Sequence, residues 1–202
     1  SDRNEDEKVK EKFLKTMAKE ATRMSSLVND LLSLTRIERI EHSPPNEKVD
    51  LGKIIKEVEQ ICVDRDLFKK IKCKFKITKK KYEIIGDSPE LKQVFLNIIE
   101  NAVTHSNSKK TVIVKLENVK SSVNFSVEDF GIGIPNENIP LLTKRFYRVD
   151  EARSRNSGNT GLGLSIVKHI VNRHNAELDI SSIEGKGTKF SINFNKDKPS
   201  LL

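Results

Sequence analysis

Two asparagines four residues apart, Asn97 and Asn101, are the first residues in this sequence whose types and spacing could do chemistry. Residues at this spacing lie on the same face of a helix, and the residues around them in the chain are largely apolar. Amide oxygens suit Mg²⁺, which takes only one or two protein ligands beside substrate phosphates. A solvated face would explain one such asparagine. Two of them, followed by His105 at the next turn, form a continuous polar stripe.

A second candidate is the run from Asp129 to Pro135, which directly follows an alternating strand pattern. Gly131 and Gly133 let the backbone approach a ligand closely, because they carry no side chain. A buried carboxylate at Asp129 can accept a hydrogen bond from an exocyclic amine. A strand-terminating turn would explain the same run equally well.

A third candidate opens a helix with the residues GNTGLGLS, in which Leu162 stands between Gly161 and Gly163. The free amides and the dipole of a helix amino terminus favour phosphate groups. The spacing fits neither the dinucleotide-binding fingerprint nor the P-loop, so both of those site classes are excluded. A last glycine pair, Gly185 and Gly187, is explained by a hairpin turn just before Thr188.

A long helix is predicted ahead of these motifs, from about Glu5 to Ile40, because this segment lacks glycine and proline. Met17, Met24 and Leu31 are seven residues apart, which is a heptad seam and favours an interhelical bundle. A solitary surface helix packed on its own domain is the alternative. The prolines of the following HSPPN segment end the helix and mark a domain boundary.

Beyond that boundary, helix and strand patterns alternate and predict an α+β two-layer sandwich, with helices on one face of a mostly antiparallel sheet. The long segment from 134 to 160 has no sustained periodicity and is expected to be a functional loop with one helical turn at 141–146. Strands are expected near 49–51, 72–77, 83–86, 111–116, 123–128, 177–182 and 188–194, and helices near 54–61, 89–105 and 162–175.

The composition gives weaker constraints. The formal net charge is +8, which suits an anionic partner but also an ordinary surface of interleaved charges. The only cysteines, Cys62 and Cys73, lie in no CxxC pair and indicate neither a metal site nor a disulfide framework. No apolar run approaches the length of a membrane helix, and the charged start does not resemble a signal peptide. We therefore expect a cytoplasmic fragment without membrane contact.

Taken in order, the segments NIIENAVTHS, DFGIGIP, RFYR, NTGLGLS and EGKGT resemble the five boxes of the histidine-kinase ATP-binding domain. That domain belongs to the superfamily shared with gyrase, Hsp90 and MutL, whose members have a Bergerat-type sandwich. The first helix resembles the second helix of the dimerisation and histidine phosphotransfer domain. The sequence of the segment RMSSLVNDLLSLTRIE is similar to that of phosphate-sensing kinases of the PhoR type.

The resemblance implies a division of the chain and a set of ligand contacts. Residues 1–43 would be the dimerisation helix, 44–48 a linker, 49–196 the ATP-binding domain and 197–202 a tail. Asn101 would ligate Mg²⁺ with help from Asn97, and Asp129 would accept the adenine amine with Thr188 nearby. The other expected ATP contacts are His105, Gly131, Gly133, Phe146 as the anchor of a lid over 147–160, Arg148, Gly161, Leu162 and Gly163, with Arg153 and Arg155 as further candidates.

Two departures from the family pattern limit these expectations. Thr104 occupies a position where many relatives carry a phosphate-binding lysine, which predicts modest nucleotide affinity. The phosphoacceptor box is absent, because none of the four histidines is followed by an acidic residue. In addition, Asn97 stands where the superfamily's ATPases carry a catalytic glutamate, and an amide cannot act as a general base. Slow hydrolysis is expected.

The resemblance implies a sensor histidine kinase that transfers the γ-phosphate of ATP to a histidine of the dimerisation domain, for relay to an aspartate of a response regulator. The parent protein would be a homodimer anchored in the bacterial cytoplasmic membrane, and this chain alone would not phosphorylate itself. The alternatives are a non-catalytic nucleotide-binding and dimerisation module and a superfamily ATPase. DNA binding is suggested by charge alone and is not expected.

Overall fold

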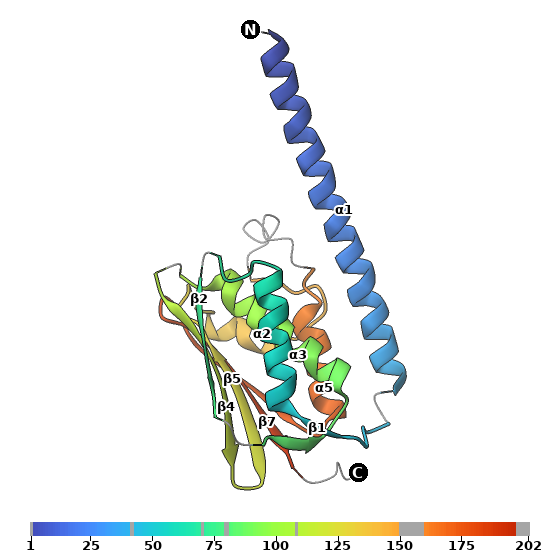
Figure 1. Ribbon diagram of the computed structural model, residues 1–202, viewed down its shortest axis with the longest axis vertical. Helices are drawn as coiled ribbons and strands as arrows, with labels where there is room; N and C mark the ends of the chain where they lie inside the picture. The colour runs from blue at the N-terminus through green and yellow to red at the C-terminus, as the bar shows by residue number, and fades with distance from the viewer. Residues whose placement is uncertain are drawn as a thin grey trace.

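The computed structural model describes residues 2–40, 43–69, 71–78, 81–107, 109–149 and 160–196. Within this part, a single long helix, α1 (Asp2–Ile40), stands beside a two-layer domain (Figure 1). The prediction of an α+β sandwich preceded by a long helix is confirmed. No helix in the described segments is long and apolar enough to cross a membrane.

The larger sheet has five strands in the order β2-β4-β5-β7-β6. Only the β2–β4 pair is parallel, and the other neighbours are antiparallel. A separate two-stranded sheet pairs β1 with β3. The bounds are β1 (Lys48–Asp50), β2 (Lys72–Ile77), β3 (Glu83–Ile85), β4 (Thr111–Val119), β5 (Ser122–Glu128), β6 (Glu177–Ile183) and β7 (Gly187–Asn195).

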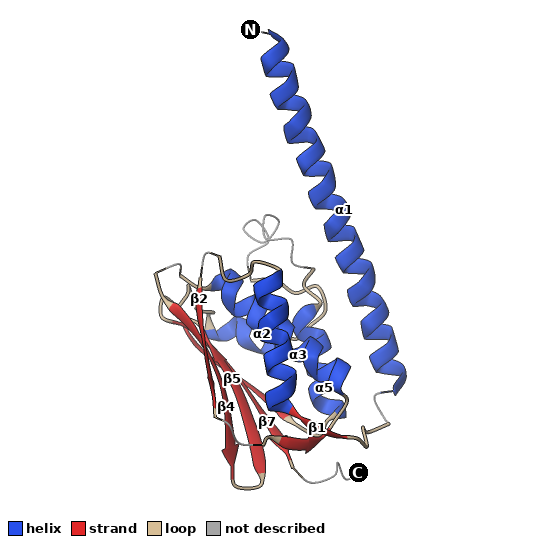
Figure 2. Ribbon diagram, in the orientation of Figure 1, coloured by secondary structure: helices blue, strands red, loops and turns tan. Residues whose placement is uncertain are grey.

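Three helices, α2 (Leu51–Asp64), α3 (Ser88–His105) and α5 (Gly163–Arg173), cover one face of this sheet (Figure 2). Aspartates begin two of them. Asp50 accepts a hydrogen bond from the Gly52 amide at 2.9 Å, and Asp87 accepts one from the Glu90 amide at 3.1 Å. These caps satisfy amides that would otherwise lack partners at the helix starts. Strand β1 therefore ends at Asp50, the residue that caps α2, one position earlier than predicted.

Among the described residues no helix covers the other face of the sheet, and the alternation along the strands reflects this. In β2, Lys72, Lys74 and Lys76 are exposed, whereas Cys73 and Phe75 lie against the core. Successive side chains of a strand point to opposite faces, so the three lysines share the open face. Strand β2 is also an edge strand, because only β4 pairs with it.

The helical turn expected at 141–146 lies earlier in the chain. The structure has a 3₁₀-helix, η1 (Asn136–Leu141), and the residues after it form turns. A proline at 140 removes one backbone donor, which favours a short helical segment of this kind. The segment that leads to Phe146 is therefore irregular.

Helix α1 divides into two parts with different surroundings. Near its end, Leu34 and Ile37 are 1% and 3% exposed and belong to the core of the domain. Further upstream, Met17 and Met24 are 54% and 70% exposed. Burying a Leu or Ile side chain is worth about 1.5–3 kcal/mol, so the last turns of α1 are firmly docked beside α5. The heptad seam upstream is left open.

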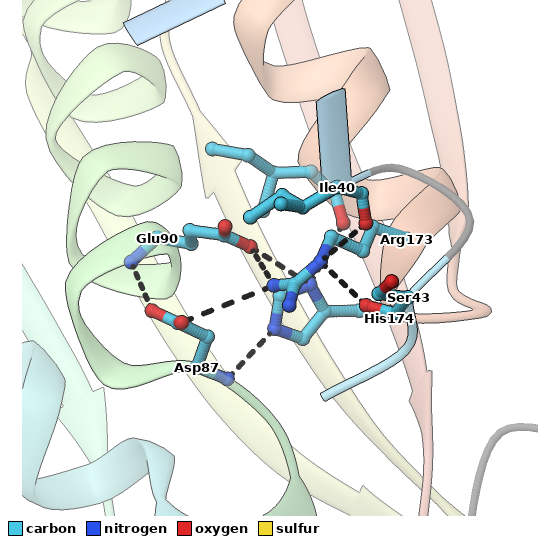
Figure 3. A network of polar contacts seen from close by, with 7 residues as sticks. Ile40, Ser43, Asp87, Glu90, Arg173 and His174 are labelled. Atoms are coloured by element: carbon cyan, nitrogen blue, oxygen red, sulfur yellow. Dashed lines mark hydrogen bonds and ion pairs between the residues drawn. The ribbon is translucent and has the colours of Figure 1, made fainter. Parts of the chain in front are cut away.

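Arg173, at the end of α5, connects the end of α1 to the domain (Figure 3). Its Nε donates to the carbonyls of Ile40 and Ser43 at 3.2 and 2.9 Å. Its terminal nitrogen pairs with Glu90 at 2.6 Å and lies 3.9 Å from Asp87. Burial raises the pKa of Glu90, and the bond to Arg173 opposes that shift. Since both partners are largely buried, loss of either one would leave an uncompensated charge.

His174 lies next to this network and is itself buried (Figure 3). Its Nε2 accepts from the Asp87 amide at 3.0 Å, and its Nδ1 lies 2.8 Å from the Ile170 carbonyl. This pattern requires a neutral ring with the proton on Nδ1. Burial accordingly lowers the pKa of His174 from 6.5 to about 4.

Candidate functional site

The polar stripe predicted on α3 is present, and it faces the amino terminus of α5. Asn97 and Asn101 are half-buried, while the neighbouring residues of α3 fill the core. The Asn97 side chain donates from Nδ2 to the Gly163 carbonyl at 3.2 Å. Within the described part of the chain, the Asn101 side chain makes no hydrogen bond. Two amide oxygens are therefore left for other ligands beside the start of α5.

The start of α5 provides unpaired backbone donors. The first intrahelical bond runs from the Ile166 amide to the Leu162 carbonyl, and Leu162 has no capping side chain. The amides of the first turn, which begins at Gly163, therefore lack intrahelical partners. Together with the helix dipole, they form a surface that favours phosphate oxygens.

A buried carboxylate lies at the end of β5. Asp129 is 5% exposed, and its Oδ1 accepts from the Gly131 amide at 2.9 Å. Its own amide donates to the Thr188 carbonyl at 2.9 Å, which brings Thr188 of β7 beside it. Burial raises the pKa of Asp129, and hydrogen bonds from the Gly131 and Thr188 amides oppose that shift. Such a carboxylate is prepared to accept a further donor from a ligand.

Gly131 is required by the close approach of two segments. A Cβ atom there would lie 1.8 Å from the carbonyl oxygen of His105, at the end of α3. Gly133 has a φ of +68°, and a Cβ on it would lie 2.2 Å from the Ile183 carbonyl oxygen. These contacts bring the loop after β5 against α3 and β6. Desolvation lowers the pKa of His105, and the nearby Asp129 carboxylate opposes this effect.

The described ends of the predicted lid are joined to each other. The Phe146 amide donates to the Gly161 carbonyl at 3.0 Å. Both residues have positive φ, +60° for Phe146 and +78° for Gly161. The Phe146 side chain is 58% exposed. Arg148 is half-buried in the first part of the lid, whereas Arg153 and Arg155 lie outside the described residues.

Helix α1 also contacts both lid ends, which no sequence motif predicted. Asp30 Oδ2 accepts from Thr160 Oγ1 at 2.6 Å. Glu38 pairs with Arg145, and its Oε1 lies 3.7 Å from His169 Nε2 of α5. The only hint in the sequence is spacing, because residues 30, 34, 37 and 38 share one face of a helix.

Comparison with known proteins agrees with this architecture. The family described as "Histidine kinase-, DNA gyrase B-, and HSP90-like ATPase" matches residues 86–198, which include the asparagine stripe, Asp129 and the start of α5. The chain belongs to this family. It therefore contains an ATP-binding domain of the histidine-kinase type, as the five sequence boxes predicted.

Relatives of this histidine-kinase-type domain include two sensor proteins. The phosphate regulon sensor protein PhoR of Pseudomonas aeruginosa is 34% identical over 90% of this chain and 41% of its own length. The sensor protein kinase WalK of Staphylococcus aureus is 36% identical over 93% of this chain and 45% of its own length. This chain thus spans less than half the length of either relative.

The solved structure of the mycobacterial sensor histidine kinase MprB is similar to the same domain. It is 27% identical, with a TM-score of 0.63, and the match covers 76% of this chain and 99% of that one. The Bergerat-type sandwich expected from the sequence is thereby confirmed.

Proposed function

We propose that this chain is the ATP·Mg²⁺-binding part of a sensor histidine kinase. In its parent protein it would transfer the γ-phosphate of ATP to a histidine of the dimerisation domain. The observation that carries the proposal is the 3.2 Å hydrogen bond from Asn97 to Gly163. It joins the amide stripe of α3 to the phosphate-favouring start of α5, so both halves of a triphosphate site lie together.

The residues present fit a magnesium ion. Asn101 and Asn97 would hold it through their amide oxygens, which are hard ligands of the kind that Mg²⁺ prefers. When bound, Mg²⁺ would neutralise charge on the phosphate oxygens. The chain's own contribution is positioning: Asp129, beside Thr188, would accept the adenine amine at one end, and the first amides of α5 would hold the phosphates at the other. His105, Gly131, Gly133 and Phe146 would shape the space between them.

The same site is poorly suited to hydrolysis. No carboxylate stands at position 97, and an asparagine cannot remove a proton from water. Catalysis would then rest on positioning and charge neutralisation for a nucleophile that arrives from another part of the parent protein. The imidazole of that acceptor would take the γ-phosphoryl group as the bond to the bridging oxygen breaks and ADP leaves.

Further parts of the proposal concern the parent protein. Residues 1–43 would be the second helix of its dimerisation domain, residues 44–48 the linker, and residues 49–196 the ATP-binding domain. The exposed seam of α1, which includes Met17 and Met24, supports this assignment. The parent would be a homodimer anchored in the bacterial cytoplasmic membrane and would pass its phosphoryl group to a response regulator.

The proposal is tested by supplying the missing acceptor. We expect this chain, mixed with the histidine-bearing helical domain of its parent and γ-labelled ATP, to place acid-labile label on that domain. The matched control is the same acceptor domain with its histidine replaced by glutamine. Absence of label under conditions where the intact kinase works would refute transfer, and steady phosphate release without an acceptor would instead indicate an ATPase.

Asp129→Asn is expected to weaken ATP binding by about 10- to 100-fold. A hydrogen bond to a charged group is worth about 1.5–3 kcal/mol. Asparagine has one acceptor oxygen where aspartate has two, and its NH₂ group cannot accept a hydrogen bond from a ligand. Asparagine has the same shape and can still accept from Gly131, so the fold should persist. Calorimetric titration with ATP measures the effect. Asp179→Asn, on the exposed face of β6, is the control, and equal affinities for the two variants would contradict the role of Asp129.

A further inference from the structure

Helix α3, which carries the asparagine stripe, has little positive charge of its own. Lys92 is the only lysine or arginine of α3, and it lies near the start of that helix. The face formed by Asn97, Asn101 and Thr104 therefore carries no positively charged side chain. A triphosphate carries several negative charges, and Mg²⁺ neutralises only part of them. A nearby side-chain cation would add binding energy at the terminal phosphate.

Arg65 of the adjoining helix reaches this region. It caps the end of α2, where its amide donates to the Ile61 carbonyl at 3.0 Å. Its side chain crosses to α3, and a terminal nitrogen lies 3.0 Å from Glu100 Oε1. Helices α2 and α3 pack side by side (Figure 1). The guanidinium is thus held over the outer surface of α3.

The position of Glu100 places Arg65 at the rim of the site. Glu100 directly precedes Asn101 and lies four residues before Thr104, so Glu100 and Thr104 share one face of the helix. Asp30 of α1, which is bonded to Thr160 at the lid end, contributes to the raised pKa of Glu100, although burial is the larger cause. The charges of both Arg65 of α2 and Asp30 of α1 therefore act on Glu100.

The contact between Arg65 and Glu100 is easily exchanged. The two side chains are 59% and 37% exposed, and ion pairs this exposed are worth only about 0–1 kcal/mol. A phosphate group is a better partner, because the planar guanidinium can donate two parallel hydrogen bonds to it. Because its side chain is exposed, Arg65 can exchange Glu100 for a phosphate group that reaches this side of α3.

We propose that Arg65 is a γ-phosphate-binding residue, which Glu100 holds at the rim of the site until ATP enters. The inference rests on the proposed function and extends it, because it assigns to α2 the cation that α3 lacks. Glu100 competes with the phosphate for the same guanidinium.

The experiment compares two ion pairs between the same helices. Arg65→Ala removes the proposed contact, and Lys92→Ala removes the pair that Lys92 forms with Glu57 at 2.5 Å, nine residues before Asn101. We expect Arg65→Ala to weaken ATP·Mg²⁺ binding by about tenfold, ADP·Mg²⁺ binding by less, and AMP binding not at all. Lys92→Ala should leave all three unchanged. Glu100→Gln should strengthen ATP binding, since it removes the competing carboxylate.

Each outcome has a separate meaning. Equal ATP affinity for Arg65→Ala and Lys92→Ala overturns the inference, as does an equal loss for ATP, ADP and AMP. Arg65→Lys provides a second variant, which should recover part of the ATP affinity because it restores the charge without the fork. Urea unfolding of each variant checks that the fold is intact. If the wild-type chain bound no ATP, the proposed function itself would fail; if it bound ATP but ignored the Arg65 change, only this inference would.

Discussion

Replacing Asn101 by alanine is expected to abolish the magnesium-dependent part of ATP binding and to slow phosphoryl transfer to a supplied histidine by about 10²–10³-fold. Loss of a single group that stabilises developing charge has effects of this size in enzymes. The Asn101 side chain has no hydrogen-bond partner within the described residues, so the alanine variant should fold normally. Asn101 is half-buried beside Asn97, and a bound ligand would give its amide group a partner.

The measurement is a pair of ATP titrations, one with Mg²⁺ and one with a chelator, followed by the labelled transfer assay. The wild-type chain should bind more tightly with Mg²⁺, whereas the variant should give the same weak affinity in both. Asn101→Asp should retain a magnesium dependence, because it keeps an oxygen ligand. Gln93→Ala removes an amide two turns earlier on α3 and is the matched control. A magnesium effect that survived in Asn101→Ala would contradict the proposed ligand.

The second large effect concerns stability in acid. His174 has a folded-state pKa of about 4, against an ordinary value of 6.5 in an unfolded chain. Between these values the unfolded chain binds more protons than the folded one, so stability is lost as the pH falls through this window. The loss from this residue is about 2 kcal/mol by pH 5 and about 3 kcal/mol by pH 4, at about 1.4 kcal/mol per pKa unit.

Urea unfolding between pH 7 and pH 4 measures this loss. His174→Gln should be less stable at pH 7 but should lose less stability in acid, because a glutamine oxygen can accept from the Asp87 amide without titrating. Glu90 lies 3.9 Å from His174 Nδ1 and has a raised pKa, which acts in the opposite direction in both chains. An equally steep loss in His174→Gln would disprove the assignment.

Local patterns predicted much of the fold because their causes are local. Asp50 and Asp87 mark helix starts, and the alternation in β2 marks its buried face. The site motifs were also recognisable in order, since Asn97, Asn101 and Asp129 each belong to a continuous segment. Their mutual contacts depend on the sheet order, which joins segments far apart in the chain. The Asn97–Gly163 bond, for example, spans 66 residues.

The distant partners of helix α1 could not be predicted from local patterns. The sequence favoured an interhelical bundle over a helix packed on its own domain, and each reading describes one part of the helix. Met17 and Met24 are open, while Leu34 and Ile37 are buried in the domain. The contacts of Asp30 with Thr160 and of Glu38 with Arg145 span 130 and 107 residues. No periodicity within α1 can identify partners at that distance.

The three lysines on the open face of β2 oppose one way in which copies of this chain could meet. An edge strand offers unpaired amides and carbonyls that another strand could use. Two copies of β2 joined in this way would bring Lys72, Lys74 and Lys76 from each chain onto one continuous surface, where like charges repel. Fibril-like growth through β2 is therefore disfavoured.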